Sequence, residues 1–254
     1  MQLFDTHAHL LSERFDEDRH ILIERQPSLG VVGVIEIGTT LEDSEAAVKL
    51  AMQTDYIYAA VGVHPHDAKD APSDFIAQLE ALIMQPKVVA IGEIGLDYHY
   101  DFSPRDVQQK VFSAQLDLAQ RHNLPVAIHM REATQDTLSI LREHKGLKGV
   151  MHCFSGSAET AQILIDMGLC ISFTGSVTFK NAKKTVDAAA TVPLNRLMAE
   201  TDCPYLSPEP IRGQRNDPSN VRYVLQRLSE INGITFDEMC RINIENVKGL
   251  YGIK

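Results

Sequence analysis

The chain has 254 residues, of which 44% are hydrophobic and 23% are charged, and its formal net charge is −10. This length suits one large α/β barrel or two small domains, and it is enough to bury a core without disulfides. The acidic balance argues against a protein that holds duplex DNA through a broad positive field, so a polyanionic substrate would be held locally, by metal ions and a few basic side chains.

Eight short apolar runs rich in Val and Ile recur along the chain, as expected for buried parallel strands. They cover residues 3–4, 31–37, 57–63, 88–91, 126–128, 149–151, 170–173 and 197–199. Apolar residues at helical spacing lie between them, over residues 41–52, 75–84, 107–119, 134–141, 158–167 and 221–231. Residues 235–238 resemble a capping box that opens a last helix ending near Gly249. The stretch 180–190 is a weaker helix candidate, because its apolar face is thin.

Strands that alternate with helices indicate a parallel sheet. No GxGxxG follows the first apolar run, which argues against an open dinucleotide-binding sheet. The placement of the polar residues favours closure of the sheet. We therefore expect a single domain over residues 1–254, a slightly irregular (β/α)8 TIM-type barrel with an extra C-terminal helix.

The four cysteines are scattered, with no CxxC pair, at Cys153, Cys170, Cys203 and Cys240. We expect reduced thiols and no zinc knuckle, and we interpret Cys153 and Cys203, which adjoin proposed ligands, as packing thiols. The first residues lack a basic segment followed by an apolar one, and no apolar run approaches the roughly 20 residues that span a bilayer. The sequence therefore predicts a cytoplasmic protein that does not associate with membranes.

Residues able to bind metal follow most of the predicted strands. In chain order they are His7 and His9 after the first strand, His64 after the third, Glu93 at the end of the fourth, His129 after the fifth, His152 after the sixth and Asp202 after the eighth. The active sites of such barrels lie at the C-terminal ends of the strands. In a closed barrel these side chains would meet, whereas an open sheet would spread them along a line.

His7 and His9 are two residues apart, so in an extended strand both side chains point to one side. Apart from His64, the set is four imidazoles with one Asp and one Glu, which suits Zn, Mn, Fe or Co, and Mg if water completes its coordination. Six groups are too many for one tetrahedral ion but suit two ions that share a carboxylate. Glu93 lies between the others in strand order and is the expected bridge. Of the other histidines, we expect His20, His122 and His144 to be solvated, while His66 and His99 are ambiguous.

These motifs resemble the TatD family of metal-dependent hydrolases, within the amidohydrolase-like superfamily, over nearly the whole chain. The matching segments are FDTHAH at 4–9, GVHPH at 62–66, GEIGLDY at 92–98, IHMR at 128–131, HCFSG at 152–156, ETDCPYL at 200–206 and RGQRN at 212–216. The resemblance implies a first ion at His7, His9, Glu93 and Asp202, and a second at Glu93, His129 and His152. It also implies a divalent-ion-dependent DNase that removes nucleotides from a DNA end.

The expected reaction is cleavage of a phosphodiester by a hydroxide activated by two divalent ions, which would be Mg, Mn or Zn. In this hypothesis Asp202 ligates an ion and accepts the proton of the water, and Glu200 orients a ligand from behind. His64 contacts the phosphate or protonates the leaving oxygen. Arg131, Arg212 and Arg215 are candidates to clamp phosphates by forked hydrogen bonds.

Two other functions stay open at this point. The same hydroxide could attack a carbonyl, which would make the chain an ester or amide hydrolase such as an aminoacyl-tRNA deacylase. A non-catalytic, metal-dependent scaffold or binding protein is the third possibility. The expected partner is a DNA end or another phosphoester substrate, and a monomer is expected, with oligomers left open.

Overall fold

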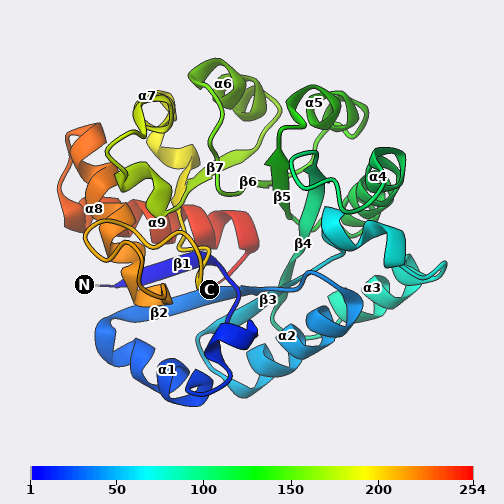
Figure 1. Ribbon diagram of the computed structural model, residues 1–254, viewed down its shortest axis with the longest axis horizontal. Helices are drawn as coiled ribbons and strands as arrows, with labels where there is room; N and C mark the ends of the chain where they lie inside the picture. Colours follow the sequence, from blue (N-terminus) through cyan, green and yellow to red (C-terminus); the bar gives the residue numbers. More distant parts are fainter. Residues whose placement is uncertain (1, 254) are drawn as a thin grey trace. The chain divides into compact units, whose positions relative to one another are not determined.

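The computed structural model describes residues 2–253 and alternates strands with helices along the chain (Figure 1). Eight strands form one sheet in chain order: β1 (Leu3–Ala8), β2 (Val31–Ile37), β3 (Ile57–Val61), β4 (Val88–Asp97), β5 (Val126–Arg131), β6 (Gly149–Met151), β7 (Cys170–Phe173) and β8 (Leu197–Ala199). The pairings β1–β2, β3–β4, β4–β5, β5–β6 and β7–β8 are parallel. All eight predicted runs are therefore strands, and the predicted (β/α)8 barrel fold is confirmed.

The helices are α1 (Arg19–Arg25), α2 (Leu41–Gln53), α3 (Phe75–Ile83), α4 (Arg105–His122), α5 (Thr134–Glu143), α6 (Ala158–Asp166), α7 (Lys183–Thr191), α8 (Val221–Asn232) and α9 (Phe236–Tyr251). The extra C-terminal helix α9 is confirmed, and its N-cap Thr235 accepts the Glu238 N–H at 3.2 Å. Helix α1 has no signal in the sequence because it buries only Leu22. Among residues 2–253, no helix has both the length and the apolar character that crossing a membrane requires.

By their packing, the described residues group into two compact units. Unit 1 comprises the described residues up to Glu36, Cys153–Ile165 and those from Cys170 onward, and unit 2 comprises Ile37–His152 and Asp166–Leu169. The single domain over 1–254 stays a prediction.

In unit 1, helix α9 ties the first strand to the last. The buried Asn243 side chain accepts the Ala199 backbone N–H at 3.0 Å and donates to the Phe4 carbonyl at 2.9 Å. Beyond the strand ends, the Asp202 N–H donates to the His7 carbonyl at 2.9 Å. The polar residues that follow β1 and β8 are thereby brought side by side.

In unit 2, strand β4 is longer than its apolar run predicts, because it extends to Asp97 and contains Glu93. Gly95 allows β4 to lie unusually close to β5 at His129. It has a φ of +143°, and a Cβ there would lie 2.0 Å from the His129 carbonyl oxygen, so only glycine fits. This close approach sets Gly95 opposite His129 in the β4–β5 register, which brings the His129 ring to Glu93.

Candidate metal centre

Unit 1 contributes one cluster of possible metal ligands, formed by His7, His9 and Asp202. The Nε2 atoms of the two imidazoles lie 3.3 Å apart. The Asp202 Oδ1 atom lies 3.3 Å from His9 Nε2 and 3.8 Å from His7 Nε2. His7 is fully buried and belongs to β1, whereas His9 directly follows that strand. The predicted same-side placement of the two histidines is therefore confirmed.

Buried hydrogen bonds hold this cluster in place from behind. The Asp5 carboxylate accepts hydrogen bonds from the Thr201 N–H at 2.8 Å and the Thr201 hydroxyl at 2.5 Å, next to Asp202. Burial raises the pKa of Asp5 well above its ordinary value, although these hydrogen bonds oppose the rise. Asp202 itself has a φ of +55°, a left-handed conformation that Asp tolerates better than most residues. The sequence offered one signal for Asp5, a carboxylate directly after the apolar pair Leu3 and Phe4.

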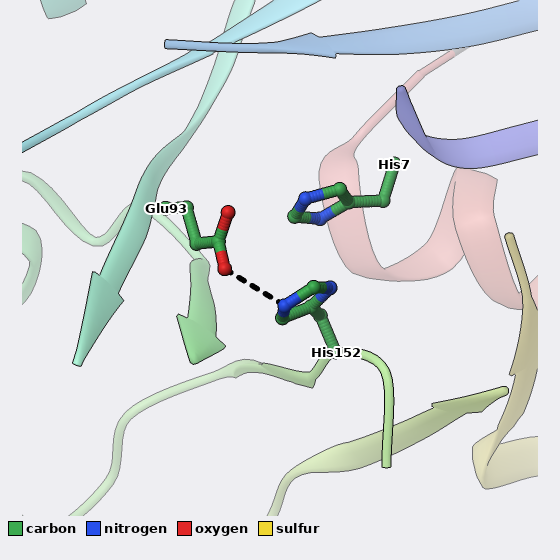
Figure 2. Close-up of side chains that lie close together, drawn as sticks. All are labelled: His7, Glu93 and His152. Carbon is green, nitrogen blue, oxygen red and sulfur yellow. Dashed lines mark ion pairs between the residues drawn. The ribbon is translucent and has the colours of Figure 1, made fainter. Parts of the chain in front are cut away.

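Unit 2 contributes a second cluster centred on Glu93. The Glu93 Oε1 atom lies 2.7 Å from His129 Nδ1 and 2.8 Å from His152 Nε2. Figure 2 shows the ion pair between Glu93 and His152 as a dashed line. The two imidazole nitrogens are 3.4 Å apart, and all three side chains are largely buried. One carboxylate oxygen thus meets two histidines that are 23 residues apart in the sequence.

Asp97, which no sequence pattern singled out, orients this second cluster. Its Oδ2 atom lies 3.0 Å from His129 Nε2 and 2.9 Å from His66 Nε2. Its Oδ1 atom accepts the backbone N–H groups of His99 at 3.0 Å and Tyr100 at 2.9 Å. Burial alone would raise the pKa of Asp97, but these hydrogen bonds outweigh it and hold the pKa well below its usual value. An ionised Asp97 therefore keeps a proton on His129 Nε2 and leaves Nδ1 facing Glu93.

The donor atoms in both clusters fit a cation. With its proton on Nε2, His129 presents a lone pair to the Glu93 oxygen, and electron-pair donors this close repel unless a proton or metal ion lies between them. Burial lowers the pKa of His129, yet the Asp97 and Glu93 carboxylates beside the ring raise this pKa overall, because both favour a positive charge there. Imidazole and carboxylate are the usual ligands of transition-metal ions. The residues present therefore fit divalent ions.

His64 lies beside the second cluster, with its Nε2 atom 3.5 Å from Glu93 Oε1. Its Nδ1 atom accepts the His66 backbone N–H at 3.2 Å, which leaves the ring proton on Nε2. Burial lowers the pKa of His64 to about 4. A neutral imidazole with an Nε2 proton can donate a hydrogen bond to a phosphate, but it is poorly suited to protonate a leaving group at neutral pH.

The remaining predicted residues have separate environments. Glu200 is fully buried and accepts the Cys153 N–H at 2.6 Å, directly after His152. Arg131 ends β5 and lies over the Tyr100 ring, 4.7 Å from its centroid.

Arg212 and Arg215 differ in how strongly their guanidinium groups are bound to other residues of unit 1. Arg212 is exposed, stacks on Phe179 at 4.0 Å and lies 3.9 Å from Glu209. Both terminal nitrogens of Arg215 bond Asp18, so its guanidinium is already engaged. Arg215 is therefore a weaker candidate for a phosphate clamp than Arg212.

One expectation about the other histidines is wrong. His144 is buried and not solvated. Its Nδ1 donates to the Ile140 carbonyl at 2.9 Å, and its Nε2 lies 3.1 Å from Asp117 Oδ1. His20 is exposed as expected, and His122 is partly buried against Glu80. The ambiguity over His66 and His99 is also settled, since His66 bonds Asp97 and His99 pairs with Glu132 at the surface.

Comparison with known proteins places the chain in a family. The sequence profile of the family described as TatD related DNase matches residues 4–252. A protein of Bacillus subtilis (strain 168) named uncharacterized metal-dependent hydrolase YabD is 46% identical over 253 residues, 99% of each chain. A protein of Citrobacter koseri named 3'-5' ssDNA/RNA exonuclease TatD is 35% identical over 258 residues, also 99% of each chain.

Solved structures agree with the sequence relatives. The crystal structure of YJJV, a TatD homolog from Escherichia coli K12, matches with a TM-score of 0.93 and 32% identity, over 99% of this chain and 98% of that one. The chain is thus a metal-dependent hydrolase of the TatD family.

Proposed function

We propose that the chain is a divalent-metal-dependent phosphodiesterase that removes nucleotides from a DNA end, an exonuclease-type DNase. The observation that carries the proposal is the pair of imidazole–carboxylate clusters, one in each unit. Two-metal sites are a common means of displacing an oxygen at phosphorus. The relative named as an ssDNA/RNA exonuclease supports the same class of bond.

In this proposal the ligand roles are those that the family motifs in the sequence imply. His7, His9 and Asp202 would hold one ion, His129 and His152 would hold the other, and Glu93 would be shared by both. The imidazole-rich donor set favours Mn or Zn over Mg. When bound, the ions would supply Lewis acidity toward a phosphate oxygen and toward water.

The protein side chains would then position the groups and move the proton. Asp202 would accept the proton of the attacking water, since its side chain is partly exposed and lies among the imidazoles of unit 1. Glu200 would hold the backbone that follows His152, through its 2.6 Å hydrogen bond with the Cys153 N–H. His64, neutral at working pH, would donate its Nε2 proton to a phosphate oxygen as a hydrogen bond.

Arginines would supply the local positive charge that the acidic chain otherwise lacks. Arg131 follows His129 by two residues, so it is placed to meet a phosphate next to the cleaved one. Arg212 is exposed and held only by a ring contact and a long ion pair, so it can turn to a phosphate. Both contacts would affect substrate binding more than the chemical step.

The test is a metal-swap nuclease assay on end-labelled single-stranded and duplex DNA, with Mn, Zn, Mg or chelator, beside aminoacyl-tRNA and simple esters. Stepwise shortening from one end that requires metal is expected. Hydrolysis of esters with no phosphodiester cleavage would instead establish the deacylase. DNA binding without cleavage under every metal would establish a non-catalytic protein.

Two variants distinguish loss of the metal site from a general effect of replacing a carboxylate. Glu93→Gln should abolish the cleavage, because it replaces the carboxylate charge shared by the two ions with a neutral amide. Glu132→Gln is the matched control, since this exposed carboxylate also pairs with a histidine, at 2.7 Å from His99. Equal activity losses in both variants would contradict the assigned role of Glu93.

A further inference from the structure

Two exposed aromatic rings follow strand β4 in unit 2. Tyr100 is 48% exposed and Phe102 is 56% exposed, although rings of this size are normally buried. The rings are stacked, with centroids 5.2 Å apart and planes inclined by 21°. A single exposed ring would need no explanation. A stacked pair presents flat apolar surface to a flat ligand.

Hydrogen bonds at both ends hold the segment that carries these rings. Asp97 accepts the Tyr100 N–H at its start. The buried Gln108 side chain accepts the Asp97 N–H at 2.9 Å and donates to the carbonyls of Asp97 at 3.1 Å and Ser103 at 2.8 Å. The Ser103 hydroxyl then donates to the His66 carbonyl at 2.8 Å. The rings are therefore presented by an anchored segment, which lowers the entropy lost when a ligand stacks on them.

The aromatic pair is connected to the proposed metal ligands of the same unit. The His66 ring lies 5.4 Å from the Tyr100 ring and 4.9 Å from the Phe102 ring, between centroids. His66 and His129 share Asp97 Oδ2, and their ring centroids are 6.3 Å apart. One imidazole thus separates the exposed rings from a candidate ligand.

A cation completes this surface. The Arg131 guanidinium lies 4.7 Å from the centroid of the Tyr100 ring, and Arg131 is exposed two residues after His129. Flat rings with a guanidinium over the Tyr100 ring match a nucleotide, because its base offers a π face and its phosphate a negative charge. An apolar peptide or a lipid chain would not use the guanidinium.

We propose that Tyr100, Phe102 and Arg131 form a nucleotide subsite, in which the rings stack on a base near the cleaved end and Arg131 binds the adjoining phosphate. This subsite rests on the proposed function, which it deepens by naming how the substrate is held. A base can stack on a protein ring only when it is unpaired, so the subsite selects frayed or single-stranded ends.

The first test is a binding experiment on the metal-loaded enzyme. The probe is a single-stranded oligodeoxynucleotide with terminal phosphorothioate linkages that resist cleavage and 2-aminopurine at its end. Stacking should quench the probe, whereas Tyr100→Ala and Phe102→Ala should reduce the quenching and weaken binding by roughly 5- to 100-fold. Phe102→Trp keeps a flat ring and should retain both. Wild-type quenching in both alanine variants overturns the subsite.

The control variant is Met84→Ala, which removes a 70% exposed apolar side chain just after helix α3, outside the aromatic pair. It should bind and quench like the wild type. Loss of quenching in Met84→Ala as well would show a general effect of removing exposed apolar surface and would also overturn the subsite.

The second test compares kcat/KM for an oligonucleotide end that carries its base with the same end made abasic. The wild-type ratio should exceed about 5 and fall toward 1 in Phe102→Ala. An unchanged ratio overturns the subsite. Absence of cleavage by the wild type with every metal overturns the proposed function instead, and the quenching result then decides the subsite by itself.

Discussion

Asp97→Asn is the most informative substitution, because the structure leaves the new amide no satisfactory orientation. The Asp97 Oδ1 atom accepts two backbone N–H groups, which cannot change their protonation. The amide oxygen must therefore take that side, and the NH2 group must face the imidazoles of His66 and His129. His129 can accept from this NH2 group only by moving its own proton from Nε2 to Nδ1. The lone pair that faces Glu93 would then be lost.

The expected magnitude follows from this change of tautomer. Loss of a carboxylate partner behind a ligating histidine typically lowers metal affinity by about 10- to 100-fold. The buried amide also replaces charge-assisted hydrogen bonds, each worth about 1.5–3 kcal/mol, so the free energy of unfolding should fall as well. Substrate affinity at saturating metal should change far less than metal affinity.

Isothermal titration of Mn into the metal-free protein, with urea denaturation in parallel, measures both effects. Asp136→Asn is the matched control, because that carboxylate accepts from the Tyr98 hydroxyl at 2.7 Å and from the Gln109 side chain at 2.9 Å, neither of which is a candidate ligand. Its metal affinity should equal that of the wild type. If Asp97→Asn binds Mn as tightly as the wild type while remaining folded, the assigned control of the His129 tautomer is refuted.

Four further outcomes are expected. Asp202→Asn should lower nuclease activity by about 100-fold or more with little change in thermal stability, and substantial turnover would refute its role as proton acceptor. Arg212→Ala should raise KM by about 10-fold with kcat nearly constant, and an unchanged KM rules the contact out. Asn243→Ala leaves a buried N–H and a buried carbonyl without their partner, so urea denaturation should show a loss of about 2–4 kcal/mol, and a loss below 1 kcal/mol would contradict this account. In the metal-free protein, burial lowers the pKa of His64 from 6.5 to about 4, so the unfolded chain binds the proton first and stability should fall as pH drops through that window. In urea titrations across pH, His64→Gln should reduce this fall in the free energy of unfolding. A fall as steep as that of the wild type would contradict the role assigned to His64.

Local patterns were enough to predict the fold. Each buried strand is a short Val- and Ile-rich run, and the helical spacing between runs predicts the crossovers that parallel strands need. The errors occurred where apolar periodicity was weak. The apolar run predicts only the first part of β4, because glycines interrupt the run before the strand ends. The apolar face predicted for α7 is narrow, because the helix buries the small residues Thr185, Ala188 and Ala189.

The candidate ligands could be named from sequence because each lies in the C-terminal half of a strand or shortly after it, and strand direction decides which half that is. The orienting residues could not. Asp5 and Asp97 are buried carboxylates whose hydrogen-bond partners include Thr201 for the first and His129 for the second, and nothing in the local sequence names those partners. His144 was misjudged for the same reason, since its partner Asp117 lies on another helix.

The sequence by itself determined the alternating architecture and which side chains can bind metal, because periodicity and residue chemistry are local properties of the chain. Only the tertiary structure decided which nitrogen of His129 faces Glu93, that burial lowers the pKa of His64, and that Tyr100 and Phe102 stack at the surface. Those properties depend on burial and on hydrogen-bond partners that meet only when the strands and helices pack.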